Sequence, residues 1–134
     1  MKKRHLFSIV IMAFFVTTAA TCQQQEDPVD ISPADLKVKL ENGKGVLLDV
    51  RRPDEVNKGV IDPSMMHYNF QDGDFKERIA QLDKKETYYV YCHAGGRSAK
   101  AVQMMKEMGF KKVYNVDGGV TKWQEEGFDL VDKK

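Results

Sequence analysis

The stretch TYYVYCHAGGRSAKAVQMMKEM, residues 87–108, predicts a strand, a loop and a helix in direct succession. Its first five residues are all aromatic or β-branched, which favours an extended strand. A loop with two adjacent glycines follows at residues 93–97. From Ser98 to Met108, apolar side chains recur on one helical face, and Gly109 is a typical residue at a helix end. Cys92 therefore stands at the junction of strand and loop.

Segments of the same two kinds alternate along the rest of the chain. Strands are predicted at residues 46–50, 65–69 and 113–116, and helices at 33–41, 74–82 and 120–126, with a turn at 118–119. This alternation predicts an α/β fold, with a mainly parallel central sheet flanked by helices on both faces. In such sheets, binding sites lie beyond the carboxyl ends of the strands, and Cys92 is placed at that edge.

The length and composition of the chain indicate one soluble domain. A chain of 134 residues is too short for two ordinary domains, and 42% hydrophobic with 31% charged residues argues against general disorder. The formal net charge is only +1, so there is no basic excess to indicate a nucleic-acid partner.

The first 21 residues have the three parts of a secretory signal peptide. Residues 1–5 carry positive charge, residues 6–16 are apolar but too short for a stable membrane span, and residues 17–21 are small or polar. An uncleaved N-terminal anchor is the alternative. Removal of residues 1–21 leaves 18 basic against 20 acidic side chains, a net charge of about −2.

The cysteine that follows, Cys22, resembles the lipidated cysteine of a bacterial lipobox. The resemblance departs from the usual pattern at Ala19, where leucine is common, and at Thr21, where glycine or alanine is more usual. Ordinary cleavage after Ala20 therefore remains an alternative. We expect an exported periplasmic or cell-envelope lipoprotein, attached to the membrane only through Cys22, with residues 22–30 as a polar tether and residues 31–134 as the folded domain.

Cys92 is the only other cysteine, and an unpaired thiol is unusual in an exported protein. It is therefore either buried and inert or reactive. A loop that turns its N–H groups inward at the start of a helix stabilises negative charge. Gly95 and Gly96 permit the backbone angles of such a loop, and Arg97 adds a fixed positive charge. These features predict a lowered pKa at Cys92 and a place for an anion.

Three segments, in order, resemble the rhodanese family. Residues 91–100 look like its active-site strand, loop and helix start, residues 47–51 like its Asp-Val-Arg motif, and residues 109–123 like its last helix–strand–turn–helix unit. The resemblance covers residues 31–127 and implies a single rhodanese-like domain. The chain departs from the family at Val60, where histidine is usual, and at Arg52, where an acidic residue is common.

The resemblance implies a sulfurtransferase without metal or organic cofactor. The Cys92 thiolate would take a sulfane sulfur from a small donor such as thiosulfate and pass it to a thiol, to cyanide or to a protein acceptor. Arg97 would hold an anionic donor or brace the loop. The backbone groups that would cradle the outer sulfur are those of His93, Ala94, Gly95, Gly96, Arg97 and Ser98.

Two supporting residues follow the preceding predicted strand. Asp49 either interacts with the active loop or forms a turn by accepting backbone hydrogen bonds. Arg51 is expected to tie loops together.

Two other functions compete with sulfur transfer. Related folds of cysteine phosphatases and arsenate reductases place five residues between the cysteine and the arginine, whereas four separate Cys92 from Arg97. The shorter loop is typical of sulfur transfer. The second alternative is a non-catalytic persulfide carrier or binding module, although such degenerate domains often lack the cysteine that this chain keeps.

Overall fold

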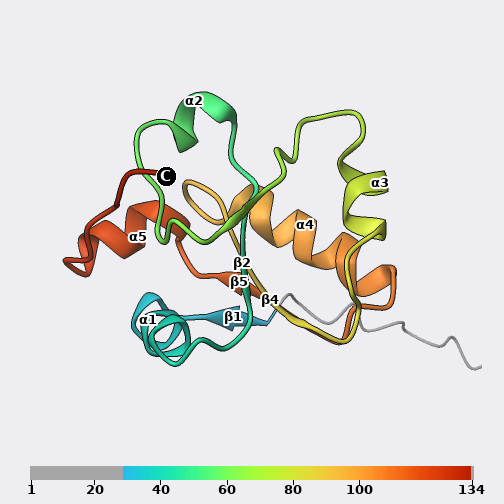
Figure 1. Cartoon of the computed structure of the whole chain (residues 1–134), viewed down its shortest axis with the longest axis horizontal. Helices are drawn as coiled ribbons and strands as arrows, with labels where there is room; N and C mark the ends of the chain where they lie inside the picture. Colours follow the sequence, from blue (N-terminus) through green and yellow to red (C-terminus); the bar gives the residue numbers. More distant parts are fainter. Residues whose placement is uncertain (1–28, 134) are drawn as a thin grey trace, which may run out of the picture.

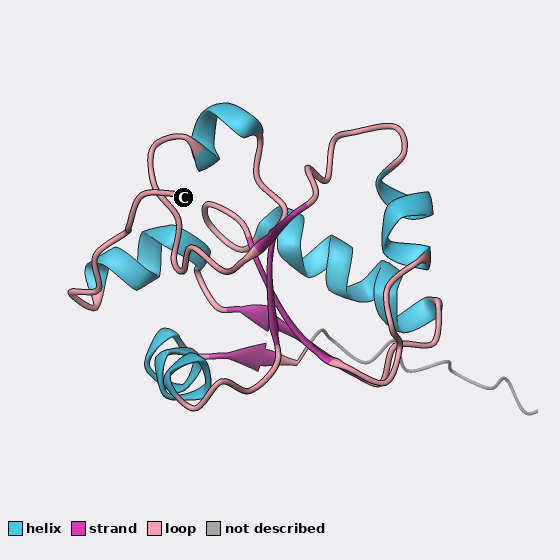
Figure 2. Ribbon diagram, viewed as in Figure 1, coloured by secondary structure: helices cyan, strands magenta, loops and turns pink. Residues whose placement is uncertain are grey.

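The computed structural model describes residues 29–133, which form a three-layer α/β domain (Figures 1 and 2). The expected signal peptide and Cys22 lie outside the described residues. Within residues 29–133, no helix is both long and apolar enough to cross a membrane.

The central sheet has five parallel strands in the order β1-β5-β4-β2-β3. The strands are β1 (Asp30–Ile31), β2 (Val46–Asp49), β3 (Met66–His67), β4 (Thr87–Tyr91) and β5 (Lys112–Val116). Leu48 pairs with Val90 in the centre of the sheet, and both side chains are fully buried. Burial on both faces explains why the β2 segment is a continuous apolar run rather than an alternating one.

Helices cover both faces of the sheet, as predicted (Figure 1). They are α1 (Pro33–Glu41), α2 (Pro53–Val56), α3 (Phe75–Ala80), α4 (Gly96–Glu107) and α5 (Gly119–Glu125). On one face, α3 and α4 enclose a core that includes Ile79 and Met105. On the other face, α1, α2 and α5 enclose a core that includes Leu36 and Trp123. The sheet thus separates two hydrophobic cores.

The structure differs from the sequence prediction mainly at the ends of elements. Helix α4 begins at Gly96, two residues earlier than predicted, so Gly96 and Arg97 belong to its first turn rather than to the loop. Helix α5 begins at Gly119, inside the predicted turn. Strand β3 is shortened to two residues, and β1, which has no distinct sequence pattern, extends the sheet at its edge beside β5.

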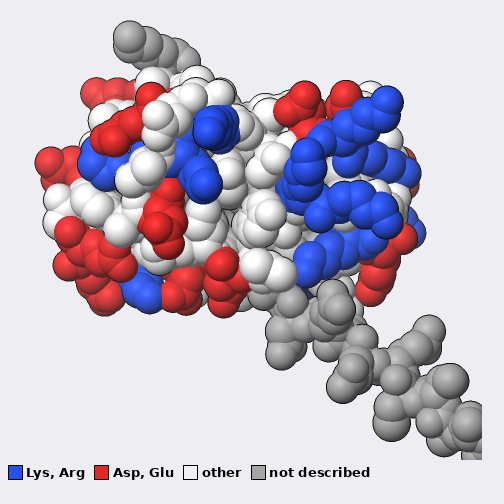
Figure 3. All heavy atoms as spheres, turned by 90° about the horizontal axis from the view of Figure 1, so that it is seen from below, with Lys and Arg blue, Asp and Glu red and all other residues white. Residues whose placement is uncertain are grey.

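Charged side chains are unevenly distributed over the surface of the domain. On the face shown in Figure 3, Lys and Arg gather at one end, whereas Asp and Glu are most frequent at the other end. On this face, therefore, the basic and acidic side chains are partly separated rather than evenly mixed.

Candidate active site

Cys92 directly follows β4, and its backbone contacts the first turn of α5. The residue is 1% exposed. The backbone N–H of Val120 donates to the Cys92 carbonyl at 3.0 Å, and that of Thr121 to the His93 carbonyl at 2.9 Å. The first turn of α5, whose N–H groups have no partner within the helix, therefore holds the backbone at the start of the loop.

The sulfur of Cys92 accepts hydrogen bonds from the loop and from α4. The Gly95 N–H donates to Sγ at 3.1 Å. The Ser98 hydroxyl lies 3.4 Å from Sγ and 3.1 Å from the Gly95 carbonyl oxygen, so its single proton has two possible acceptors. A charged thiolate is the stronger acceptor of the two, so ionisation of Cys92 recruits this proton.

The pKa of Cys92 results from two opposing effects. Burial is the largest single effect and raises the pKa, because a thiolate loses solvation in the interior. Hydrogen bonds from the Ser98 hydroxyl and from the backbone N–H groups of Ser98, Gly95 and Arg97 lower it. The hydrogen bonds prevail, so the pKa of Cys92 lies below its ordinary value and the nucleophilic thiolate is favoured.

Only one of the two loop glycines uses the backbone freedom of glycine. Gly95 has φ +96° and precedes the first residue of α4, whereas Gly96 has no positive φ and begins the helix. The positive φ of Gly95 redirects the chain into α4, and the Gly95 N–H at this point donates to Cys92 Sγ. The remaining loop residues, His93 and Ala94, are exposed.

Arg97 is bound by Glu55, a residue to which the sequence analysis assigns no role. Arg97 Nη1 donates to Glu55 Oε2 at 2.7 Å, and Nη2 donates to Oε1 at 2.8 Å. The hydrogen bonds from Arg97 are the main cause that lowers the pKa of Glu55 to about 2. The sequence signal for Glu55 is its position three residues after Arg52, whose N–H donates to Glu55 at 3.1 Å as in a capping box.

Asp49 and Arg51 form an ion pair that is almost fully buried. Asp49 accepts from the Arg51 N–H at 2.9 Å and from Arg51 Nη2 at 2.7 Å. Arg51 Nη2 also donates to the Gly59 carbonyl at 2.8 Å, and Nη1 to the Glu55 carbonyl at 3.3 Å. Asp49 thus forms the turn after β2. Among residues 29–133, no hydrogen bond joins it to the loop around Cys92.

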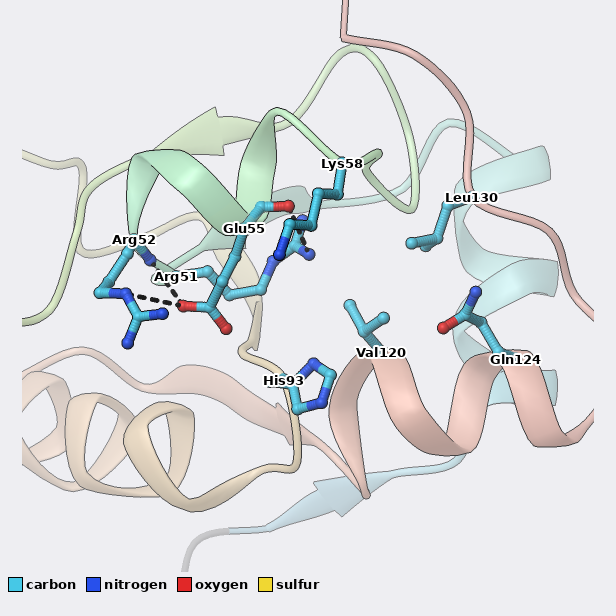
Figure 4. A pocket seen from close by; sticks show the side chains of 8 residues that line it. All are labelled: Arg51, Arg52, Glu55, Lys58, His93, Val120, Gln124 and Leu130. Carbon is cyan, nitrogen blue, oxygen red and sulfur yellow. Dashed lines mark hydrogen bonds and ion pairs between the residues drawn. The ribbon is translucent and has the colours of Figure 1, made fainter.

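A cavity of about 430 Å³ opens beside the loop that follows Cys92, residues 93–95, which is called the active loop here after the resemblance above (Figure 4). The segment around α2 forms one side of it and α5 the opposite side, while the loop and the C-terminal segment complete the wall. The lining residues are Arg51, Arg52, Glu55, Lys58, His93, Val120, Gln124 and Leu130. Cys92 is not among them, but its neighbour His93 is, so the loop that holds the thiol adjoins the cavity.

Comparison with known proteins points to one family. The model of the rhodanese-like domain matches residues 32–126. The putative sulfur carrier protein YrkF of Bacillus subtilis is 36% identical over 95 residues, covering 70% of this chain and 50% of that protein. A sulfurtransferase of Allochromatium vinosum is 28% identical over 106 residues, covering 76% of this chain and 94% of that protein.

The solved structures agree with this match. The crystal structure of a rhodanese-related protein from Thermoplasma volcanium has a TM-score of 0.68 and 30% identity, covering 77% of this chain and 97% of that one. Similar proteins also include a thiosulfate sulfurtransferase, a polysulfide-sulfur transferase and tRNA uridine(34) hydroxylases, of whose length the chain spans 31% to 39%. The chain belongs to the rhodanese-like domain family, which includes proteins named as sulfurtransferases and as sulfur carriers.

Proposed function

We propose that this chain is a rhodanese-type sulfurtransferase and that Cys92 carries the transferred sulfur as a persulfide. The observation that carries the proposal is the hydrogen bonding of Cys92 Sγ by the Gly95 N–H and the Ser98 hydroxyl at the start of α4. These donors lower the pKa of the thiol and favour the nucleophile. The relatives named as sulfurtransferases support the same reaction.

Thiosulfate is the donor that we propose. The Cys92 thiolate attacks the sulfane sulfur, the sulfur–sulfur bond of thiosulfate breaks, and sulfite leaves with the electron pair. The product is a negatively charged persulfide on Cys92. A thiolate or cyanide then attacks the outer sulfur, forms an organic persulfide or thiocyanate, and restores the Cys92 thiolate.

The surroundings of Cys92 suit the intermediate as well as the nucleophile. The outer sulfur of a persulfide lies about 2 Å beyond Sγ and carries the negative charge. N–H groups at the start of α4 stabilise an anion there by the same means as in other helix-terminal anion sites. Arg97 contributes a nearby positive charge, partly neutralised by Glu55.

The test is intact-mass spectrometry of the chain from residue 23 onward after incubation with thiosulfate. We expect the wild type to gain the mass of one sulfur atom and to lose it when cyanide is added. Cys92→Ser is the control and should gain nothing. A wild-type protein with a free thiol that stays unmodified would exclude thiosulfate as the donor, and incubation with polysulfide would then test the sulfurtransferase proposal itself.

A persulfide carrier is the second candidate function, because one similar protein is named as a putative sulfur carrier. The two functions differ in turnover. An enzyme releases many equivalents of thiocyanate from thiosulfate and cyanide per Cys92. A carrier forms the persulfide in one turnover and discharges it slowly to small molecules.

We also propose that the protein is an exported lipoprotein anchored through Cys22. The support is the order of basic, apolar and small residues before Cys22. Labelled palmitate should be incorporated into the full chain expressed in a bacterial host and should be absent from Cys22→Ser. Secretion of unlabelled protein cleaved after Ala20 would instead support ordinary export.

A further inference from the structure

The C-terminal segment folds back over the cavity and is held at several points. This segment, residues 127–131, is called the strap here and lies beyond the residues that match the family model. Trp123 Nε1 donates to the Asp129 carbonyl at 3.1 Å. Val60 and Val131 exchange two backbone hydrogen bonds of 2.8 Å in an isolated antiparallel bridge. The strap is therefore an ordered wall of the cavity.

The strap contributes an apolar side chain to the cavity. Leu130 packs so closely on Gly59 that a Cβ at Gly59 would lie 3.0 Å from Leu130 Cβ. Figure 4 shows Leu130 pointing into the cavity, with Val120 of α5 facing the same space. Gln124 of α5, which is exposed, is the polar side chain beside them. One part of the cavity is thus suited to a carbon skeleton.

The opposite part of the cavity carries a positive charge, that of Lys58, which forms no ion pair within residues 29–133. Arg51 is paired with Asp49, and Arg52 with Asp54. Lys58 is exposed, and its side chain extends into the cavity in Figure 4. An anionic group of a bound molecule can therefore pair with Lys58 without displacing an existing partner.

We propose that this cavity binds the sulfur acceptor, and that the acceptor is a small organic thiol that carries a carboxylate. The inference rests on the proposed sulfurtransferase function. A volume of about 430 Å³ lies within the range of about 300–1,000 Å³ that is typical of small-molecule sites. Thiosulfate or cyanide would leave most of it empty. The carboxylate pairs with Lys58, and the carbon skeleton packs on Leu130 and Val120.

The transfer step in this cavity conserves atoms and charge. The acceptor thiolate attacks the outer sulfur of the Cys92 persulfide, the bond between that sulfur and Cys92 Sγ breaks, and the electron pair returns to Sγ. The products are an organic persulfide anion and the Cys92 thiolate. No oxidant or reductant takes part.

The first test compares two acceptors that differ only in charge. N-acetylcysteine carries a carboxylate, and N-acetylcysteine amide is its neutral counterpart. The persulfide is loaded on the full chain, and its discharge by each thiol is followed by intact mass, with rates corrected for the thiolate fraction of each thiol. We expect Lys58→Gln to lower the ratio of the anionic to the neutral rate about two- to fivefold, the range for an exposed ion pair. Lys76→Gln, at an exposed lysine of α3, is the matched control and should leave the ratio unchanged.

The second test concerns the apolar wall. Leu130→Ala should slow discharge by both N-acetylcysteine compounds about three- to tenfold, because a contact with the carbon skeleton is lost. Discharge by cyanide, which is too small to depend on the apolar wall, should slow less than discharge by the two thiols. Val131→Ala is the matched control in the strap, since Val131 pairs through its backbone and does not line the cavity.

The outcomes separate this inference from the proposed function. If no persulfide forms with thiosulfate or polysulfide, both fail. If the persulfide forms but Lys58→Gln slows the charged and the neutral thiol equally, the carboxylate assignment is wrong. If Leu130→Ala slows cyanide as much as the thiols, or changes no rate, the strap is not part of an acceptor site.

Discussion

At the scale of single residues, Cys92 is deeply buried and yet has a lowered pKa. It is 1% exposed, a setting that by itself raises the pKa of a thiol and makes it inert. The donors at Gly95 and Ser98 reverse this effect. The side chain is therefore protected from bulk solvent, while its hydrogen bonds favour the thiolate.

Ser98→Ala should raise the pKa of Cys92, because the mutation removes a hydrogen bond to the thiolate and leaves burial unchanged. A hydrogen bond to a charged group contributes about 1.5 kcal/mol or more, so alkylation by iodoacetamide at pH 7 should slow about tenfold. The measurement is the alkylation rate as a function of pH. Ser64→Ala, at an exposed serine, is the control. A Ser98→Ala profile equal to that of the wild type would remove the hydroxyl from the explanation.

Glu55 should make the protein less stable in acid. Its pKa is about 2 in the folded protein, below its value in the unfolded chain, so its stabilising effect is complete above about pH 5 and is lost as the pH falls toward 2. Urea unfolding between pH 5 and pH 2 should show that the wild type loses about 1–3 kcal/mol more than Glu55→Gln does. The exposed Glu77→Gln should behave like the wild type. Parallel curves for the wild type and Glu55→Gln would contradict the prediction.

At the scale of elements, the active loop depends on the close approach of α5 to the end of β4. Gly119, the first residue of α5, has φ +56°, and a Cβ there would lie 2.3 Å from the Cys92 carbonyl oxygen. That carbonyl accepts from the Val120 N–H at 3.0 Å, so any displacement of α5 also releases Cys92. Residue 119 must therefore be glycine for two reasons: its backbone has a positive φ, and a Cβ would overlap with the Cys92 carbonyl oxygen.

Gly119→Ala should destabilise the fold by about 3–5 kcal/mol, since it adds a steric clash to backbone strain. Gly43→Ala is a matched control, because Gly43 has φ +62° but a Cβ there would meet no heavy atom within 4 Å. It should lose only the strain energy, about 1–2 kcal/mol. Urea unfolding of both variants measures the difference. Equal losses would mean that α5 can move away from Cys92 at little cost.

At the scale of the whole molecule, the strap connects parts that are distant in sequence. Phe128 packs on Trp123 with ring centroids 4.8 Å apart, and Val131 pairs with Val60 beyond α2. The strap therefore joins the C-terminal helix to the segment that follows β2. Through Leu130, this segment also forms part of the cavity wall.

Truncation after Glu126 should lower the free energy of unfolding by about 2–4 kcal/mol, because an aromatic contact and two backbone hydrogen bonds are lost. Truncation after Val131 is the control and should cost less than about 0.5 kcal/mol, since it keeps these contacts. Chemical denaturation of the three proteins measures both values. A fully stable protein ending at Glu126 would show that the strap is not part of the cooperative unit.

The sequence alone determined most of the elements and the position of Cys92 between a strand and a helix. Strand β4, the helix after the loop and the glycines beside Cys92 follow from local patterns of burial, turn residues and helix ends, which depend on near neighbours. The α/β class follows from the alternation of these segments, and the parallel sheet of the structure and its solved neighbours confirm it. The two-residue β1 carried no such pattern because its pairing depends on β5, more than 80 residues away.

The tertiary structure decided which distant side chains meet. Glu55 and Arg97 are 42 residues apart, and they pair because β2 and β4 are neighbours in the sheet, which brings α2 beside the start of α4. Leu130 reaches the cavity only because the chain turns back after α5 and pairs with Val60. Contacts of this kind depend on strand order and on the path of the chain, and no local sequence pattern encodes either.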